Sequence, residues 1–373
     1  MSSAAPLSFS EDKRVTQLQF DPAALHRYLI EHRLVSPASA LLSIEPFSRG
    51  QSNPTFLVTL REPDAGAAPT QLVLRKKPHG TLLPSAHQVD REFRVMQALH
   101  RVGFPVPRMH CLCMDAAVIG AHFYVMEYVP GRIFSNAALM KLSDAERTAA
   151  SREAARVLAQ LHDVDVDAVG LGDLGRRDSY YRRSLARWSE QYVSARTDDI
   201  GSIELLLKAL PMRLPTESPG DVSIVHGDFK FDNLIFHATE MRIVAVLDWE
   251  LSTLGHWSAD VAYWCMTNRL LGHAVGLDDA GLQARGLLSE AQFVALYRQS
   301  GRRGDARALS DADWRFYVAF SYFKLAGIMQ GVYKRFLMGN SSDPKAAQAC
   351  NPATIGMLGD AACSLLRLNS AKL

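Results

Sequence analysis

The hydrophobic pattern of the chain changes near residue 130, and this change limits the folds that the chain can adopt. Before it, short β-forming runs such as residues 56–60 (FLVTL) and 71–74 (QLVL) are separated by turn-prone segments. After it, long segments carry apolar residues at helical spacing, and only short runs are typical of strands. The pattern predicts an α+β fold of two lobes, the first small and rich in β-structure, the second larger and helical.

The expected domain organisation follows from this change. A chain of 373 residues is long enough for its core to divide into two or three units. Residues 1–20 are polar and are expected to be loosely ordered, residues 21–129 form the first lobe, and residues 130–373 form the second. The boundary lies beside Pro130-Gly131, a pair that interrupts regular structure.

The elements expected in each lobe are set by spacing and by turn residues. In the first lobe, Asp21-Pro22 is typical of a helix start, and a second helix is predicted over residues 86–101. Further strands are predicted near residues 108–114 and 122–128. In the second lobe we expect helices over residues 143–162, 179–192, 203–210, 259–271, 290–299, 311–338 and 346–368, and strands at residues 224–225, 234–236 and 243–247.

Composition excludes several classes of function. The chain carries 41 Lys and Arg against 39 Asp and Glu, a formal charge of +2, so nucleic acid is not an expected partner. Its five cysteines are scattered, which argues against a disulfide framework or a structural zinc site.

Two segments bear on the compartment. The first fifteen residues lack the apolar core of a secretory signal. The most apolar stretch, residues 317–338, is interrupted by Lys324, Gln330, Lys334 and Arg335, so we expect a buried helix and no membrane span. Together these features predict a cytoplasmic protein, and they leave its oligomeric state open.

One familiar phosphate-binding string occurs in an unsuitable context. Residues 170–175 (GLGDLG) match GxGxxG, but a dinucleotide site needs this string between a buried strand and a helix. Here it follows an acidic stretch and continues into Arg176-Arg177-Asp178. We therefore predict an ordinary turn.

The candidate catalytic and metal-binding residues lie between residues 223 and 250. Short β-forming runs flank Asp228, Asn233 and Asp248, which are spaced so that all three side chains can meet in one cleft. Phosphoryl transfer from ATP uses these groups: one carboxylate accepts the proton of the acceptor hydroxyl, while a second carboxylate and an amide oxygen hold Mg²⁺. The alternative is that these residues only form turns between strands.

At these residues the chain resembles the aminoglycoside phosphotransferase and choline kinase family, whose fold is that of the protein kinases. Its HGDxxxxN stretch corresponds to the kinase HRDxxxxN loop, and Leu247-Asp248-Trp249 stands where kinases have DFG. The resemblance implies that Asp228 is the catalytic base and that Asn233 and Asp248 bind Mg²⁺. It also implies that Lys230 steadies the transferred phosphate.

The resemblance extends to the first lobe. Residues 48–55 (SRGQSNPT) correspond to the loop that covers the nucleotide, where Ser52 and Asn53 would meet the phosphates. Arg75 stands at the position of the phosphate-binding lysine in the kinase VAIK strand, and Glu92 on the next helix is its expected partner. Lys76 is expected to face the opposite side of the strand and to be solvated, unless a bulge exchanges it with Arg75.

The lobe junction, residues 124–131 (YVMEYVPG), resembles a kinase hinge. By that resemblance Met126 lies at the back of the nucleotide pocket, while the backbone of Glu127 and Val129 binds the adenine. Asp260 is expected to support the catalytic loop by accepting backbone N–H groups. His256-Trp257 stands where many relatives have Asp-Pro, a departure that affects this support and leaves the chemistry intact.

The sequence says less about the molecule that accepts the phosphoryl group. Within the family, the chain is most similar to the kinase-like domain fused to some acyl-CoA dehydrogenases in three stretches, VLRKKP, AHQVDREF and HGDFKFDNLIF. This resemblance implies a hydroxyl acceptor such as a hydroxy acid or a hydroxyacyl coenzyme A ester. Residues 178–213 are rich in Arg and Lys, which favours an anionic small molecule if they face the cleft, although they could equally form a solvated face. The alternatives are an aminoglycoside kinase, a protein kinase and a nucleotide-binding pseudokinase, and ATP is not distinguished from GTP.

Overall fold

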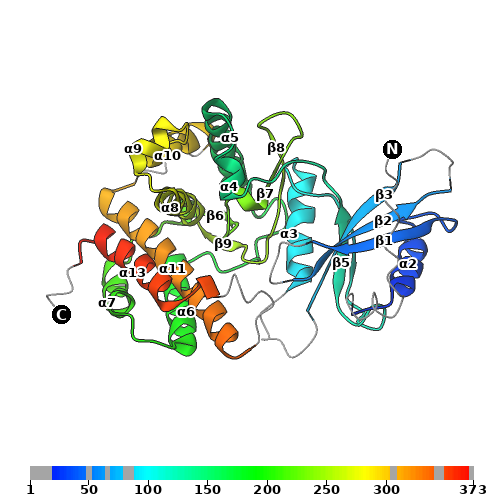
Figure 1. Cartoon of the computed structure of the whole chain (residues 1–373), viewed down its shortest axis with the longest axis horizontal. Coiled ribbons are helices and arrows are strands. Elements are labelled where there is room, and N and C mark those ends of the chain that lie inside the picture. Colours follow the sequence, from blue (N-terminus) through cyan, green and yellow to red (C-terminus); the bar gives the residue numbers. More distant parts are fainter. Residues whose placement is uncertain are drawn as a thin grey trace, which may run out of the picture. The chain divides into compact units, whose positions relative to one another are not determined.

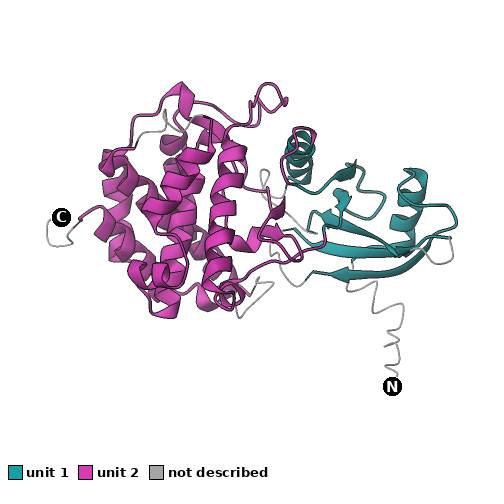
Figure 2. Ribbon diagram, turned by 90° about the horizontal axis from the view of Figure 1, so that it is seen from above, with its two compact units in different colours: residues 1–100, 106–129 teal, residues 101–105, 130–373 magenta. Residues whose placement is uncertain are grey.

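The computed structural model describes residues 19–47, 53–63, 68–78, 88–302, 309–339 and 348–368. The chain divides into two compact units, coloured separately in Figure 2. Unit 1 consists of Met1–His100 and Val106–Val129, and unit 2 consists of Arg101–Pro105 and Pro130–Leu373. The N-terminal stretch that we expect to be loosely ordered lies, up to residue 18, outside the described residues.

Unit 1 is built on a five-stranded antiparallel sheet with the strand order β1-β2-β3-β5-β4 (Figure 1). The chain enters it through a helix whose first N–H groups are capped by the Asp21 carboxylate, as the Asp21-Pro22 pair predicts. Its elements are α2 (Pro22–Glu31), β1 (Ala40–Pro46), β2 (Thr55–Arg61), β3 (Thr70–Lys76), α3 (Val89–Arg101), β4 (Met109–Cys113) and β5 (Phe123–Glu127).

Alternation along the strands separates two faces of this sheet. Leu72 and Leu74 of β3 belong to a core cluster that includes Leu25 and Leu29 of α2. The residues between them point the other way, because successive side chains of a strand alternate. Arg75 is paired in register with Tyr124 of β5, so the two side chains share the face opposite to α2.

Lys76 corrects one expectation. It lies on the face opposite to Arg75, as predicted, but it is only 1% exposed and its ammonium group lies 5.9 Å from the centre of the Phe20 ring. The expectation of a solvated lysine is therefore wrong, because α2 and Phe20, two residues before it, cover this face. Burial lowers the pKa of Lys76 to about 8.

We expect Lys76→Met to stabilise the protein at neutral pH, by about 1–3 kcal/mol, because it removes the cost of burying a charge. Below pH 8 the lysine is charged in both states, so this cost is complete. As the pH rises from about 8 towards 10.5, the folded protein loses the proton first, and its free energy of unfolding increases. The advantage of the variant, measured by urea unfolding, should therefore shrink from pH 7 to pH 10.

Lys77→Met is the matched control, since Lys77 is the next residue and is only partly buried. It should leave the free energy of unfolding nearly unchanged at both pH values. A Lys76→Met variant less stable than the wild type at pH 7 would contradict the cost that we assign to the buried charge.

Unit 2 is mostly helical, with two small antiparallel sheets formed by β6 with β9 and by β7 with β8 (Figure 1). Its core joins aromatic and aliphatic residues of α6, α7, α8, α11 and α13. Its helices are α4 (Asn136–Leu139), α5 (Asp144–His162), α6 (Tyr180–Ala195), α7 (Gly201–Ala209), α8 (Ser258–Val275), α9 (Asp279–Ala284), α10 (Glu290–Ser300), α11 (Asp311–Leu337) and α13 (Pro352–Leu365), and its strands are β6 (Val222–Val225), β7 (Leu234–Phe236), β8 (Ile243–Val246) and β9 (Thr253–His256).

Most expected elements lie within a few residues of those in the structure. The strand β9 and the short helices α4 and α9 were not anticipated, because a run of four to six residues carries too little periodicity to be recognised. Among the described residues, no helix is both long enough and apolar enough to cross a membrane.

Candidate active site

Unit 1 gathers three polar side chains around the Glu92 carboxylate. Glu92 lies in the first turn of α3, is 1% exposed, and is 3.0 Å from the guanidinium of Arg75. The amide of Asn53 donates to it over 2.7 Å, and the hydroxyl of Tyr124 donates over 3.1 Å. The expected pairing of Arg75 with Glu92 is confirmed. Sequence reasoning missed Tyr124, although its cross-strand register with Arg75 is the signal that places it here.

The other residues expected to bind nucleotide are distributed as follows. Ser52 lies outside the described residues. Met126 is buried near the end of β5, and the exposed Glu127 follows it, with its backbone N–H bonded to the carbonyl of Arg108. Val129 lies two residues beyond β5 and is partly buried. Their roles in nucleotide binding stay predictions.

In unit 2, three donors hold the Asp228 carboxylate. The loop that carries Asp228 begins directly after β6. Tyr263 of α8 donates its hydroxyl to Oδ1 over 2.7 Å. The amide of Asn233 donates to Oδ2 over 2.9 Å, and the ammonium of Lys230 lies 3.0 Å from the same oxygen. The carboxylate is therefore oriented from both sides.

The backbone of this loop is fixed by Asp260. Its two carboxylate oxygens accept the N–H groups of His226 and Gly227, each over 2.7 Å, which confirms the expected supporting role. Gly227 has a φ of +87°, and an added Cβ would lie 2.8 Å from the carbonyl oxygen of Leu251. Only glycine fits this position, because both the backbone conformation and the space exclude a side chain.

Asp260 remains ionised although it is fully buried. Burial favours the neutral carboxyl, but His162, His226 and the hydrogen bond from the Gly227 N–H outweigh it and lower the pKa of Asp260. His162 in turn contacts the Tyr297 hydroxyl over 2.8 Å. The loop thus depends on a buried chain of hydrogen bonds that begins in α10 and passes through α5.

Lys230 remains charged beside Asp228. Burial works against its charge, but the carboxylate of Asp228 outweighs this effect and raises the pKa of Lys230. A cation therefore lies next to the Asp228 carboxylate.

Asn233 and Asp248 supply oxygen donors suited to magnesium. The amide nitrogen of Asn233 is committed to the backbone and side chain of Asp228, so its oxygen is the atom left to accept a metal. The backbone links this loop to the Asp248 turn, because the N–H of Leu247 donates to the carbonyl of Asn233 over 2.8 Å. Mg²⁺ is commonly held by one or two carboxylates together with substrate phosphates, and this sparse donor set fits that preference.

The backbone of Asp248 is unusual. Its φ is +66°, a left-handed conformation that few residues other than glycine, Asn and Asp adopt. The following Trp249 is fully buried and packs against His226, with ring centres 4.6 Å apart. This packing fixes the turn that orients the Asp248 carboxylate.

Comparison with known proteins identifies the family. A family model described as "Phosphotransferase enzyme family" matches residues 43–297. The chain belongs to this phosphotransferase family. It is 43% identical over 355 residues to the Arabidopsis thaliana protein named "Probable acyl-CoA dehydrogenase IBR3", covering 90% of this chain and 42% of that protein. The chain thus spans about two fifths of the length of this curated relative.

Solved structures confirm the kinase-like fold of this phosphotransferase. A Ralstonia eutropha protein described as a "putative aminoglycoside phosphotransferase" is 40% identical, with a TM-score of 0.73, covering 92% of this chain and 99% of that one. A Plasmodium vivax ethanolamine kinase has 13% identity and a TM-score of 0.59, with 96% of each chain covered, and shows the fold alone. The predicted family resemblance and the α+β, protein kinase-like fold are therefore correct.

Besides Tyr124, sequence reasoning missed three residues of unit 2 that hold Asp228 and its loop. Tyr263 follows Asp260 by three residues on α8, so helical spacing could have placed the two on one face. Lys324 donates to the carbonyl of Gly227. In the sequence it stands out only as a charged residue within an apolar helix. His162 gave no local signal, since its partner Asp260 is 98 residues away.

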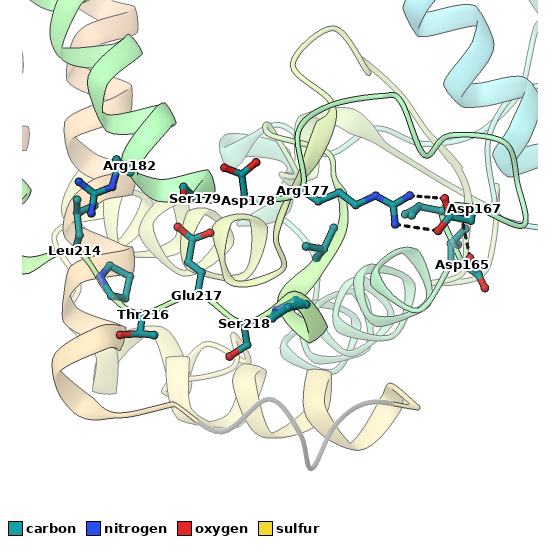
Figure 3. Close-up of a pocket in the computed structure, with 15 residues that line it drawn as sticks. Asp165, Asp167, Arg177, Asp178, Ser179, Arg182, Leu214, Thr216, Glu217 and Ser218 are labelled. Atoms are coloured by element: carbon teal, nitrogen blue, oxygen red, sulfur yellow. Dashed lines mark hydrogen bonds and ion pairs between the residues drawn. The ribbon is translucent and has the colours of Figure 1, made fainter.

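A large cavity of unit 2 involves other residues. It has a volume of about 860 Å³ and lies between the start of α6 and the segments 164–167 and 214–222 (Figure 3). Arg177 points to Asp167 across its edge, and Glu217 accepts the backbone N–H groups of Tyr180 and Tyr181. Arg177 and Asp167 thus pair with each other, Glu217 is held by backbone N–H groups, and Asp228 is not among the lining residues.

The GxGxxG string lies near this cavity and forms a turn. Gly170 has a φ of +74°, α5 precedes the string, and α6 does not begin until Tyr180. The string therefore lacks the preceding strand and the following helix that a dinucleotide site requires, as the sequence predicts.

Proposed function

We propose that this protein transfers the γ-phosphoryl group of ATP to the hydroxyl of a small anionic alcohol. The observation that carries the proposal is the Asp228 carboxylate, oriented by Tyr263, Asn233 and Lys230 within a fully anchored loop. A carboxylate held in this way can accept a proton without reorganising, which is the condition for effective general-base catalysis. An inactive nucleotide binder would have no need of this arrangement.

In the proposed reaction Asp228 accepts the proton of the acceptor hydroxyl as the oxygen attacks the γ-phosphorus. The bond between this phosphorus and the bridging oxygen of ADP breaks, and ADP leaves. The ammonium of Lys230 stabilises the negative charge of the phosphoryl group in transit. Proton, phosphoryl group and leaving group are then all accounted for.

We assign magnesium to the amide oxygen of Asn233 and the carboxylate of Asp248. When bound, the ion would neutralise charge on the nucleotide phosphates and fix their position. In unit 1, Arg75, kept in place by Glu92, would bind phosphate together with Ser52 and Asn53. Met126 and the backbone of Glu127 and Val129 would bind the adenine.

The proposal of an anionic acceptor depends on one arginine of α6. Arg183 pairs with Asp178, and Arg196 pairs with Glu204 over 2.6 Å. Among the described residues, no carboxylate pairs with Arg187. Its guanidinium lies over the Trp188 ring, 5.3 Å from the centre.

Contacts connect this arginine to the base. Lys324 lies 5.9 Å from the centre of the same Trp188 ring and 5.0 Å from that of Tyr263, whose hydroxyl donates to Asp228. An exposed guanidinium on this side of the base favours a carboxylate or phosphate on the acceptor, because such pairs form strong bidentate bonds. Hydroxy acids and hydroxyacyl coenzyme A esters have this chemistry.

The test is ATP consumption with a panel of acceptors. We expect phosphorylation of hydroxy acids or of hydroxyacyl coenzyme A esters, confirmed by mass spectrometry as a product that gains one phosphate. Kanamycin-like polycations should not react, because like charges repel. Saturable phosphorylation of an aminoglycoside, with no activity on any anionic alcohol, would contradict the acceptor class.

Arg187→Gln tests the same assignment within the chain. It should raise the KM for the anionic acceptor by about tenfold or more while leaving the KM for MgATP unchanged. Arg196→Gln, at the C-terminal end of α6, is the matched control, and it should change neither KM, since Arg196 is occupied by Glu204.

A further inference from the structure

Unit 2 contains a buried lysine that the proposed reaction does not use. Lys324 lies in the middle of α11, is 7% exposed, and has its ammonium group near the rings of Trp188 and Tyr263. Burial lowers its pKa to about 8, although the carboxylates of Asp228 and Asp260 favour its charged form. A neutral residue of similar size would avoid this cost, so the cation calls for an explanation.

The hydrogen bond of Lys324 shows which group the lysine acts on. The ammonium of Lys324 donates to the carbonyl of Gly227, which belongs to the peptide unit joining Gly227 to Asp228. The N–H of the same peptide unit donates to Nδ1 of His226 over 3.1 Å. Both polar ends of this peptide are therefore held, one of them by a side chain 97 residues away.

The Gly227–Asp228 peptide depends on outside contacts to hold its orientation. Gly227 lacks a side chain and lies at positive φ, so its own conformational preferences restrict the peptide little. Asp260 fixes the N–H groups of His226 and Gly227, but neither of its bonds reaches the carbonyl of Gly227. A rotation of that carbonyl would turn the Cα–Cβ bond of Asp228 and misdirect its carboxylate.

A second contact links the lysine to the same carboxylate. The ammonium lies 5.0 Å from the centre of the Tyr263 ring, whose hydroxyl donates to Oδ1 of Asp228 over 2.7 Å. A cation over the face of a phenol ring is attracted to it and strengthens the hydroxyl as a donor. Lys324 thus acts on the main chain and on the side chain of Asp228.

We propose that Lys324 is a positioning residue that locks the Gly227–Asp228 peptide and so sets the direction of the Asp228 carboxylate. The catalytic consequence rests on the proposed function, whereas the structural consequence does not. The experiment therefore includes one measurement that needs no substrate.

The variants are Lys324→Met, which keeps the length of the side chain without its charge, and Lys324→Arg, which keeps the charge. Lys334→Met is the matched control, because Lys334 lies on the same helix and also donates to a backbone carbonyl, that of Ser194, over 2.6 Å. Each full-length variant is compared with the wild type in hydrogen exchange of the Asp228 amide, thermal unfolding and steady-state kinetics.

In Lys324→Met the Asp228 amide should exchange at least about tenfold faster, while the melting temperature stays equal or rises, since a buried charge is lost. With the acceptor found in the panel, kcat should fall about 10- to 100-fold, because small misplacements of a reacting group have effects of this size. The KM for MgATP should not change. Lys324→Arg should restore most of the lost kcat, and Lys334→Met should resemble the wild type.

Unchanged amide exchange in Lys324→Met overturns the inference whatever the kinetics. Faster exchange with an unchanged kcat also overturns it, since the peptide would then not set the direction of the base. A lowered melting temperature, with kcat lost and not restored by Lys324→Arg, would show an ordinary structural role. A wild type that consumes no MgATP with any acceptor refutes the proposed function instead, and amide exchange still decides whether Lys324 locks the peptide.

Discussion

Asp228→Asn should lower turnover by about two orders of magnitude or more, because general-base catalysis typically contributes 10²–10⁴-fold. The amide is close to the carboxylate in shape, so the loop can keep its bond from Tyr263 and its backbone anchors to Asp260. What it cannot do is accept the proton of the acceptor hydroxyl. The measurement is kcat with a confirmed acceptor, together with MgATP affinity, which should persist.

Asp232→Asn provides the control for this change. Asp232 lies in the same loop four residues further on, and its side chain is exposed. The control variant should keep kcat within a few-fold of the wild type, since it removes a charge without touching the base. Turnover of Asp228→Asn near that of the wild type would remove Asp228 from the reaction.

The parts of the site that could be predicted are those set by motif order. Arg75 and Glu92 lie on consecutive elements, and the resemblance of their positions to those of the kinase family was enough to predict their pairing. Asp260 could be anticipated as the support of the loop because its place after the Asp248 turn resembles that of the kinase family. Motif order thus predicted one contact of the site in each unit.

The parts that could not be predicted depend on contacts between distant segments. His162 meets Asp260, and Lys324 meets Gly227, across about one hundred residues of chain. No periodicity connects such pairs, because the packing of α5 and α11 around the loop decides them. A lysine within an apolar helix gives a signal of its own, but the sequence does not say which group the ammonium will meet.

For Lys76 the sequence predicted the direction of the side chain but not its burial. Its face of β3 was correctly predicted, but a long charged side chain was assumed to reach solvent. In the structure Phe20 and α2 cover that face, so the ammonium is buried. Alternation predicts the direction of a side chain, whereas the depth at which it ends is set by tertiary packing.

The second large effect is expected at Asp248. Asp248→Ala should weaken MgATP binding by at least about tenfold, the size typical of disturbing a metal site, while metal-free adenosine binds almost as before. Calorimetric titrations with the two ligands measure the difference directly. Equal losses for both would mean that Asp248 only shapes the turn.

Because Asp248 has a φ of +66°, an alanine there also strains the backbone, and part of any loss could come from the turn itself. Asp248→Asn separates the two effects, since asparagine tolerates this conformation and retains one oxygen donor while losing the charge. If the carboxylate binds magnesium, the asparagine variant should keep the melting temperature of the wild type and still lose MgATP affinity. If the turn alone matters, it should bind both MgATP and adenosine like the wild type, and the metal would then have to be assigned to other oxygens than those of Asp248.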